Sequence, residues 1–194
     1  MSRADVQRLR ARACAVITGS GTVVADDPLL TVRDSQYEMR GRRPTRVVLD
    51  TDLRTPPTAQ VLCFAGSTLI MTRDASSSLA VPLREAGARV ESIAVSDAGR
   101  LDLGAVLARL GELECNEALV EAGPTLAGDF MSSGLVDELV LYVAPVLLGH
   151  AARGLFNLPA LERMCDRCEF DWKDVERVGG DLRLTLRPRP KAGA

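Results

Sequence analysis

The sequence predicts an α/β protein with a mostly parallel sheet flanked by helices and an antiparallel C-terminal hairpin. Short apolar segments alternate with segments of helical periodicity along most of the chain, and strand-like segments dominate its end. The early apolar segments are continuous rather than alternating, as expected for parallel strands that are covered on both faces. The pair Gly179-Gly180 separates the last two strand-like segments, and such a pair is typical of a hairpin turn.

The first element is a helix, predicted over residues 2–13. Ser2 is the expected N-cap, and Asp5 follows three residues later, as at many helix starts. The apolar side of this helix consists of Val6, Leu9 and Ala13. Further helices are predicted over part of 77–87, over 101–113 and over 123–134. Pro82 limits where the first of these starts, and Gly134 is expected to end the last.

Six strands are predicted before the hairpin. They cover residues 14–18, 45–50, 67–72, 89–95, 117–121 and 137–149. The last of them is expected to be long, with an interruption at Pro145, because proline has no N–H for a ladder hydrogen bond. The hairpin covers residues 168–188, so the sheet is expected to end in an antiparallel edge.

The composition indicates one domain, residues 1–194, with enough apolar residues (46%) for a sizeable core. The net charge is −2 and no block of Lys and Arg stands out, which argues against a nucleic-acid surface. The chain has no apolar run that could span a bilayer, and its N-terminus lacks the apolar stretch of a signal peptide. We therefore expect a cytoplasmic protein without a membrane partner.

The five cysteines and the only histidine restrict the chemistry. The cysteines are odd in number and lie mostly in apolar surroundings, which predicts buried thiols in a reducing compartment. Cys165 and Cys168 form a lone CxxC pair, but a zinc site needs further ligands, so we expect no metal and interpret the spacing as coincidental. His150 lacks the surroundings of a nucleophile elbow and is interpreted as a loop residue.

Polar residues follow several predicted strands at the point where each strand ends. They lie at 18–22, 50–51, 72–73 and 121–126. Because the carboxyl ends of parallel strands meet at one edge of a sheet, ligands of open α/β sheets bind there. The convergence of these clusters predicts a ligand site on that rim.

The segment "VEAGPTLAGDF", residues 120–130, is the most informative part of the rim. Gly123 gives a tight turn and Pro124 suits the first helical turn. The backbone N–H groups that follow can bind an anion such as a pyrophosphate; an ordinary strand–turn–helix joint is the alternative. Neither this segment nor "GSGTVV" fits the GxGxxG or P-loop pattern. Glu121 is either a solvated strand-end carboxylate or an acceptor for ligand N–H and O–H groups.

Residues 19–33, "GSGTVVADDPLLTVR", place two aspartates and a proline between apolar residues. Asp27 precedes the proline and is expected to be extended. One of Asp26 and Asp27 faces a ligand in this interpretation, while the other closes a turn. Arg10 and Arg33 could each hold a phosphate in bidentate fashion. For Arg10, however, the charge pattern favours the solvent-facing side of the first helix, and for Arg33 a charge on the rim is the alternative.

The segments "VITGSGTVVADDPLLTVR", "RVVLD", "LVEAGPTLAGDFMSSGLVDELVLYVAPVLLG" and "GLF" resemble, in this order, the C-terminal reductase domain of the RibD family of riboflavin biosynthesis. The resemblance implies a dihydrofolate-reductase-like fold. It also implies NADPH-dependent reduction of 5-amino-6-(5-phosphoribosylamino)uracil to the ribitylamino product. Family members usually pair, so the resemblance implies a homodimer, with contacts expected at residues 138–148 and in the C-terminal hairpin.

The resemblance also implies roles for individual residues. The cofactor-binding positions are Thr22, Asp26, Thr51, Gly123, Pro124, Thr125, Leu126, Ala127, Gly128 and Asp129. The substrate-binding positions are Arg10, Leu30, Arg33 and Glu121. Hydride transfer rests on the cofactor and on positioning, so no nucleophile or metal is required. Glu121 and Asp26 are the best candidates for a catalytic side chain. Arg73 is a candidate for binding the 2′-phosphate of the cofactor, although the resemblance gives no matching family position for it.

The chain departs from the family at its start. The family's first strand, the tryptophan-bearing loop after it and the zinc deaminase domain have no counterpart in this sequence. That strand belongs in the sheet interior, so without it backbone groups stay unpaired and part of the nicotinamide pocket is missing. We expect weak or absent reductase activity from this chain alone. The alternatives are a reductase of the same fold with another pyrimidine or pteridine substrate, and a non-catalytic remnant that keeps nucleotide-binding or dimer surfaces.

Overall fold

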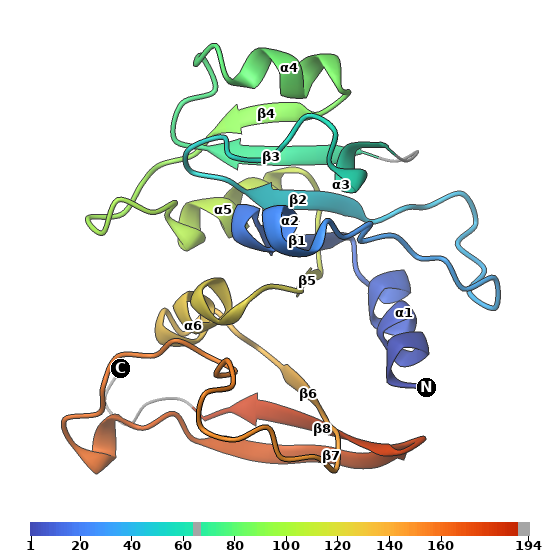
Figure 1. Ribbon diagram of the computed structural model, residues 1–194, viewed down its shortest axis with the longest axis vertical. Coiled ribbons are helices and arrows are strands. Elements are labelled where there is room, and N and C mark those ends of the chain that lie inside the picture. The colour runs from blue at the N-terminus through green and yellow to red at the C-terminus, as the bar shows by residue number, and fades with distance from the viewer. Residues whose placement is uncertain (64–66, 190–194) are drawn as a thin grey trace.

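The computed structural model describes residues 1–63 and 67–189, which form two β-sheets and the helices around them (Figure 1). The first sheet has five parallel strands in the order β4-β3-β2-β1-β5. They are β1 (Ala15–Gly19), β2 (Thr45–Leu49), β3 (Thr68–Thr72), β4 (Arg89–Ser92) and β5 (Ala118–Val120). The predicted parallel sheet is therefore confirmed. β4 ends before the expected limit at residue 95 because its partner β3 ends at Thr72, opposite Ser92.

Six α-helices and a short 3₁₀ helix accompany the strands of the described chain. They are α1 (Ser2–Arg12), α2 (Ser20–Asp26), α3 (Gln60–Cys63), α4 (Ala80–Glu85), α5 (Leu103–Glu112), α6 (Pro124–Ser132) and η1 (Met164–Asp166). No helix within residues 1–63 and 67–189 has both the length and the apolar surface that a bilayer crossing needs.

Helices cover both faces of the first sheet, which is why its strands are continuously apolar. One face packs against α2, α3 and α4 in a cluster that includes Val16, Val23, Val48, Val61, Ile70 and Leu83. The other face packs against α5 and α6 in a cluster that includes Ile17, Val47, Met71, Val106, Leu110 and Phe130. Neighbouring residues of each strand thus enter different cores, in agreement with the two-sided burial predicted for parallel strands.

The second sheet is antiparallel and has the order β6-β8-β7. It consists of β6 (Leu139–Val143), β7 (Phe170–Val178) and β8 (Asp181–Pro188). The predicted hairpin is confirmed, and Gly179 adopts a positive φ of 66° in its turn, as glycine does readily. The expectation of one continuous sheet with an antiparallel edge is wrong, because these strands form a sheet of their own.

The predicted strand 137–149 stops at Val143, so the expectation of a long strand is also wrong. Val143 lies opposite Leu182, next to the hairpin turn. Beyond this pair only Asp181 of β8 remains before the turn, where it lies opposite Val178 of β7, and Pro145 lacks an N–H.

The two sheets lie one above the other in Figure 1, with β5 and β6 as the facing outermost strands. α6 connects them and lies beside the space between their edges. Among the described residues, β5 pairs only with β1 and β6 pairs only with β8. Each of these two strands therefore has one edge without a strand partner in this part of the chain.

The ends of the helices differ from the sequence-based expectations at Ser2 and Asp27 and agree with them at Gly134. Ser2 lies inside α1 rather than capping it; Met1 is the N-cap, and the Ser2 hydroxyl donates to Asp181 instead. Gly134 has a positive φ of 67° just after α6, as predicted for a helix stop. α2 was not predicted. Asp27 follows it in the left-handed region (φ 41°) rather than extended, because it must reverse the chain at the end of that helix.

Candidate active site

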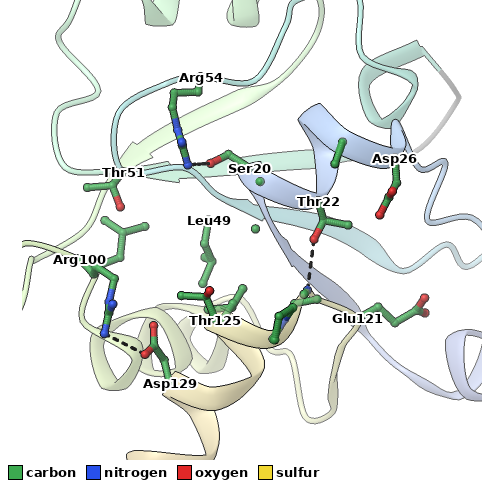
Figure 2. A pocket seen from close by; sticks show the side chains of 18 of the residues that line it. Ser20, Thr22, Asp26, Leu49, Thr51, Arg54, Arg100, Glu121, Thr125 and Asp129 are labelled. Atoms are coloured by element: carbon green, nitrogen blue, oxygen red, sulfur yellow. Dashed lines mark hydrogen bonds and ion pairs between the residues drawn. The ribbon is translucent and has the colours of Figure 1, made fainter. Parts of the chain in front are cut away.

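A cavity of about 1060 Å³ lies at the carboxyl ends of β1, β2 and β5 (Figure 2). Its walls include residues 19–22 around the start of α2 and residues 121–126 between β5 and α6. They also include Leu49 at the end of β2 and Thr51, Asp52 and Arg54 after it. The predicted convergence of polar segments at one rim is therefore confirmed for these three strands, whereas a ligand there stays a prediction. Thr72 and Arg73, after β3, are not among the lining residues; the Thr72 hydroxyl donates to the carbonyl of Thr51 at 3.0 Å.

The joint between β5 and α6 presents backbone donors to the cavity. Gly123 is the N-cap of α6, Pro124 opens the helix, and no side chain caps it. The first N–H to bond back is that of Ala127, which donates to the carbonyl of Gly123 at 3.1 Å. The N–H groups of Thr125 and Leu126 therefore have no acceptor within the helix, and both residues line the cavity. Such a helix start favours a bound anion.

The N–H of Gly123 itself donates to the hydroxyl of Thr22, at 3.2 Å (Figure 2). This bond ties the start of α6 to α2. Thr22 and Gly123 belong to segments about 100 positions apart, so the rim segments 18–22 and 121–126 meet in one wall of the cavity.

Arg10 and Glu121 form a bidentate ion pair at one end of the cavity. Arg10 Nε and Nη2 each donate to one carboxylate oxygen of Glu121, both at 2.7 Å. Arg10 Nη1 donates to the carbonyl of Thr31 at 3.0 Å. The prediction that Arg10 faces solvent is wrong: only 9% of the residue is exposed, because the side of α1 that carries it packs toward β5. Glu121 keeps unused lone pairs for a ligand.

α1 is also fixed at its other end, against the second sheet. The Asp5 carboxylate accepts hydrogen bonds from Arg8 Nε at 2.8 Å, Tyr142 Oη at 2.7 Å and Arg183 Nη1 at 3.0 Å. Burial alone raises the pKa of Asp5, but these three donors and their charges together hold the pKa well below its usual value. Burial and the neighbouring carboxylate raise the pKa of Tyr142.

The two adjacent aspartates have separate environments. Asp26, at the end of α2, lines the cavity, whereas Asp27 does not. Asp27 Oδ1 accepts from the backbone N–H of Gln60 at 2.8 Å, and the carbonyl of Asp27 accepts from Gln60 Nε2 at 3.1 Å. Asp27 thus closes the turn, and Asp26 is the one of the pair that faces the cavity.

Leu30 and Arg33 lie further along the same loop. Leu30 is buried, has a positive φ of 50° and lines the cavity. Arg33 does not line it; Arg33 lines a second cavity of about 480 Å³, which Leu30 also borders. The backbone N–H of Arg33 donates to Gln7 Oε1 at 2.7 Å. Leu30 therefore separates Arg33 from the other predicted substrate residues.

Most of the remaining predicted positions line the main cavity. These are Thr22, Thr51, Gly123, Pro124, Thr125, Leu126 and Asp129. Ala127 and Gly128 do not line it. A Cβ at Gly128 would clash with the carbonyl oxygen of Asn157, so Gly128 lets the segment around Asn157 pack on α6. Asn157 in turn donates to Thr125 Oγ1 at 2.9 Å and lines the cavity.

Sequence reasoning missed several lining residues, above all Arg54 and Arg100. Arg54 lies in the turn after β2, where Asp50 accepts from the backbone N–H of Arg54 at 2.9 Å and of Thr55 at 2.7 Å. Arg100 forms an ion pair with Asp129 at 2.8 Å (Figure 2). The polar cluster predicted after β2 stopped at Thr51, in the same turn as Arg54, whereas nothing local marks Arg100, which precedes α5.

The cysteines and the histidine lie outside this cavity. None of the residues that line it is a cysteine or a histidine. Cys63, Cys165 and Cys168 are exposed, so the prediction of buried thiols is wrong for them; Cys165 and Cys168 lie on exposed segments around η1. His150 is exposed in a turn, which confirms the loop interpretation. The cavity thus combines an ion pair, helix N–H donors and hydroxyl groups, a set suited to binding and orienting a phosphorylated ligand.

Similarity to known proteins identifies the family to which this chain belongs. Residues 1–184 match the RibD C-terminal domain family. The chain is 40% identical over 195 residues to the riboflavin biosynthesis protein RibD of Escherichia coli, covering 95% of this chain and 52% of that protein. It is 29% identical over 197 residues to a protein of Buchnera aphidicola named 5-amino-6-(5-phosphoribosylamino)uracil reductase, covering 97% of this chain and 93% of that protein.

Among solved structures, Acinetobacter baumannii RibD superposes with a TM-score of 0.82 at 36% identity, covering 97% of this chain and 50% of that one. The chain thus spans about half the length of the RibD proteins it matches. The similarity confirms the predicted fold class, since these proteins share the parallel sheet with flanking helices and the antiparallel strands.

Proposed function

Because this chain belongs to the RibD C-terminal domain family, a family of riboflavin-pathway reductases, we propose that it reduces 5-amino-6-(5-phosphoribosylamino)uracil with NADPH. The observation that carries the proposal is one cavity that joins the Arg10–Glu121 pair to the uncapped start of α6. The first feature suits a polar pyrimidine with a sugar phosphate, and the second suits a dinucleotide pyrophosphate.

The residues fit a dinucleotide cofactor. The cavity volume of about 1060 Å³ is slightly above the roughly 300–1,000 Å³ usual for small-molecule and cofactor sites, which leaves room for a dinucleotide. The N–H groups of Thr125 and Leu126 would hold the pyrophosphate, with Thr22 and Thr51 offering hydroxyl groups nearby. NADPH supplies the hydride when it is bound.

The protein's own contribution is positioning. Arg10 fixes the Glu121 carboxylate in one orientation, and that carboxylate would accept N–H or O–H groups of the substrate. Leu30 would pack against the substrate, with Arg33 behind it toward the phosphate. Asp26 is a polar group at the cavity wall, on the same side of the view in Figure 2 as Glu121. With both ligands bound, these residues would hold C1′ of the ring-opened imine against the nicotinamide. This alignment would supply most of the rate, because it removes much of the entropic cost.

The direct test is to offer the substrate and NADPH to a longer form of the protein that includes a strand for the open edges of β5 and β6. We expect consumption of NADPH, measured by its absorbance, and formation of the ribitylamino product, measured by mass spectrometry. Heat-treated protein and a reaction without the pyrimidine are the controls. Absence of turnover together with absence of NADPH binding would sink the proposal.

The chain as it stands is proposed to be weakly active or inactive. β5 and β6 each have an edge without a strand partner among the described residues, and the cavity borders the end of β5. A strand in that place would supply further walls for the nicotinamide and substrate. Turnover by the 194-residue chain equal to that of the longer form would contradict this. Binding of NADPH without turnover would favour the alternative of a remnant that keeps its nucleotide site.

We also propose that the chain forms a homodimer through its second sheet. The support is a group of exposed apolar side chains in and near β6, β7 and β8. They include Val143, Val146, Leu147, Leu148, Trp172, Val175 and Leu182. These positions coincide with the contacts expected at 138–148 and in the hairpin.

We also propose that the protein is cytoplasmic. Its relatives are named as riboflavin biosynthesis proteins. Its five cysteines form no disulfide among the described residues, as expected in a reducing compartment.

A further inference from the structure

The end of the cavity remote from Arg10 and Glu121 combines apolar lining with positive charge. In Figure 2, Thr51, Arg54 and Arg100 lie on the opposite side of the view from Glu121 and Asp26. Leu49 lies next to them, and Leu101 and Leu103 follow Arg100 in the chain and also line the cavity. If the start of α6 holds the pyrophosphate, this end receives the adenosine half of the cofactor, for which leucine side chains are suitable neighbours.

The arginines of the cavity differ in how their charges are balanced. Arg10, Arg54, Arg100 and Arg153 line it. Arg10 is paired with Glu121 and Arg100 with Asp129. Arg54 Nη2 donates to the hydroxyl of Ser20 at 3.1 Å, a neutral acceptor, and no described carboxylate pairs with Arg54. Its charge is therefore available to a ligand.

The carboxylates near Arg54 are occupied. Cofactor sites that prefer NADH usually place a carboxylate after the second strand, where it accepts the ribose 2′-hydroxyl, whereas an arginine accommodates a 2′-phosphate. Here Asp50 is fully buried and accepts from the N–H groups of Arg54 and Thr55 and from the Thr55 hydroxyl at 2.6 Å. Asp52 also lines the cavity, but its carboxylate is ion-paired with Arg73. The end of β2 thus presents a cation, and no free carboxylate of the described chain, to the ribose.

Arg73, the sequence-based candidate for the 2′-phosphate, does not fit this place. It does not line the cavity. Its guanidinium is paired with Asp52, and its Nε also donates to the carbonyl of Thr51 at 3.3 Å.

We propose, on the basis of the proposed function, that Arg54 binds the 2′-phosphate of NADPH and selects NADPH over NADH. Its guanidinium presents several N–H donors in one plane, which match phosphate oxygens. Ser20, now bonded to Arg54, would be released or would donate to the same phosphate. Asp50 is a positioning residue, because its three hydrogen bonds fix the turn that carries Thr51 and Arg54.

Arg153 provides an internal comparison. It belongs to the segment whose Asn157 donates its backbone N–H to the carbonyl of Pro124 at 2.9 Å. Like Arg54, Arg153 is paired with no described carboxylate, but the segment that carries it bonds to the start of α6 through Asn157. Its loss should weaken NADPH and NADH alike, because both contain the pyrophosphate.

The test uses two fragments that differ only in the phosphate position at issue. Calorimetry on the purified chain compares 2′,5′-ADP with 5′-AMP, and then NADPH with NADH, so no turnover is required. The wild-type chain should prefer the 2′-phosphorylated member of each pair by about 10- to 100-fold, the range of one or two charge-assisted hydrogen bonds. Arg54→Gln should remove most of this preference and leave 5′-AMP binding unchanged; Arg54→Lys should keep part of it.

Arg73→Gln and Arg153→Gln are the matched controls, and both should keep the preference. Equal unfolding temperatures of all variants exclude misfolding as a cause. A preference that survives in Arg54→Gln, or that disappears in Arg153→Gln, overturns the assignment. Equal wild-type affinities for NADPH and NADH overturn the inference alone, whereas binding of neither dinucleotide overturns the proposed function with it.

Discussion

At the scale of single residues, the pairing of Arg10 with Glu121 is the feature that most separates this site from an ordinary surface. The side chain of Arg10 is 11% exposed and that of Glu121 24% exposed. Desolvating two charges is costly, and removing one partner of such a pair leaves an uncompensated charge. A protein keeps this arrangement where the geometry of the charges is needed, here at the proposed substrate end of the cavity.

We predict that Arg10→Gln weakens binding of the pyrimidine substrate by about 10- to 100-fold, because Glu121 loses the two charge-assisted bonds that orient it. NADPH affinity should be unchanged, since the proposed cofactor contacts lie at α6 and β2. Calorimetry with each ligand separates the two effects. Arg12→Gln is the control: Arg12 pairs with Glu117 at 2.6 Å but its side chain is 55% exposed. Equal losses for both ligands would mean that Arg10 acts only through stability.

At the scale of elements, α6 depends on a close approach by the segment around Asn157. Gly128 permits this approach because a side chain there would meet the backbone of Asn157. Glycine inside a helix normally lowers helix stability relative to alanine. Its presence here is explained by packing, and the sequence pattern alone assigned the same residue to cofactor binding.

We predict that Gly128→Ala lowers the free energy of unfolding by about 1–3 kcal/mol, since the backbone of Asn157 must move. Gly111→Ala is the matched control. Gly111 lies in α5 with nothing within 4 Å of an added Cβ, so the substitution should raise the free energy of unfolding by about 0.4–1 kcal/mol. Urea unfolding of both variants measures the difference. If both substitutions stabilise the protein, the backbone of Asn157 can move away from residue 128 at little cost in free energy.

α1 is the element that joins the two sheets by side chains. Asp5 bonds Tyr142 of β6 and Arg183 of β8, while Arg10, one and a half turns later, reaches Glu121 after β5. The same helix thus sets the distance between the second sheet and the substrate end of the cavity.

We predict that acid destabilises the protein partly through Asp5. The pKa of Asp5 in the folded state lies below its unfolded value of 3.8, so its contribution is complete above that value and is lost as the pH falls toward the folded pKa. Asp5→Asn should lower the free energy of unfolding at neutral pH by about 1–3 kcal/mol and flatten its decline below pH about 4.

Urea titrations at several pH values test this expectation. Asp171→Asn is the control, because the Asp171–Arg189 pair is mostly exposed; it should change neither the stability at neutral pH nor the slope. Parallel curves for Asp5→Asn and the wild type would contradict a role for this carboxylate in acid unfolding.

At the scale of the whole molecule, the two sheets differ in how completely they are covered. The first sheet has cores on both faces. The second exposes Trp172 at 67%, and the segment after β6 exposes Leu147 at 101%. Large exposed apolar patches on a protein often mark an interaction surface. A second copy of the chain is the proposed cover.

We predict that Trp172→Asp shifts the protein from dimer to monomer in sedimentation at micromolar concentration, because a carboxylate in an apolar contact loses its hydration. Val81→Asp is the control: Val81 is 49% exposed on α4, which lies beside β4 at the opposite end of the molecule (Figure 1). A wild-type chain that is already monomeric, or a Trp172→Asp variant that remains dimeric, would contradict the proposed interface.

Sequence patterns were reliable for features that depend on a single short segment, such as a strand, a turn or a helix end. The five strands of the first sheet, the hairpin at Gly179 and the helix end at Gly134 all appeared close to their predicted positions. α2 was not predicted because it is short and contains two valines, and because Gly19 and Gly21 lie on either side of Ser20. These features are typical of a loop. Charge patterning misplaced Arg10, since it cannot tell a solvent-facing helix side from one that meets a buried carboxylate far along the chain.

The sequence by itself determined the class of fold, the rim on which the cavity lies and, through its motifs, the family. Apolar runs, glycines and helix starts are local, and local propensities do not depend on distant partners. Only the tertiary structure decided that Arg10 meets Glu121, that Asp26 rather than Asp27 faces the cavity, that Arg54 and not Arg73 lines it, and that the C-terminal strands form a separate sheet. Each of these depends on contacts between segments far apart in the chain, whose pairing is set by packing of the whole molecule.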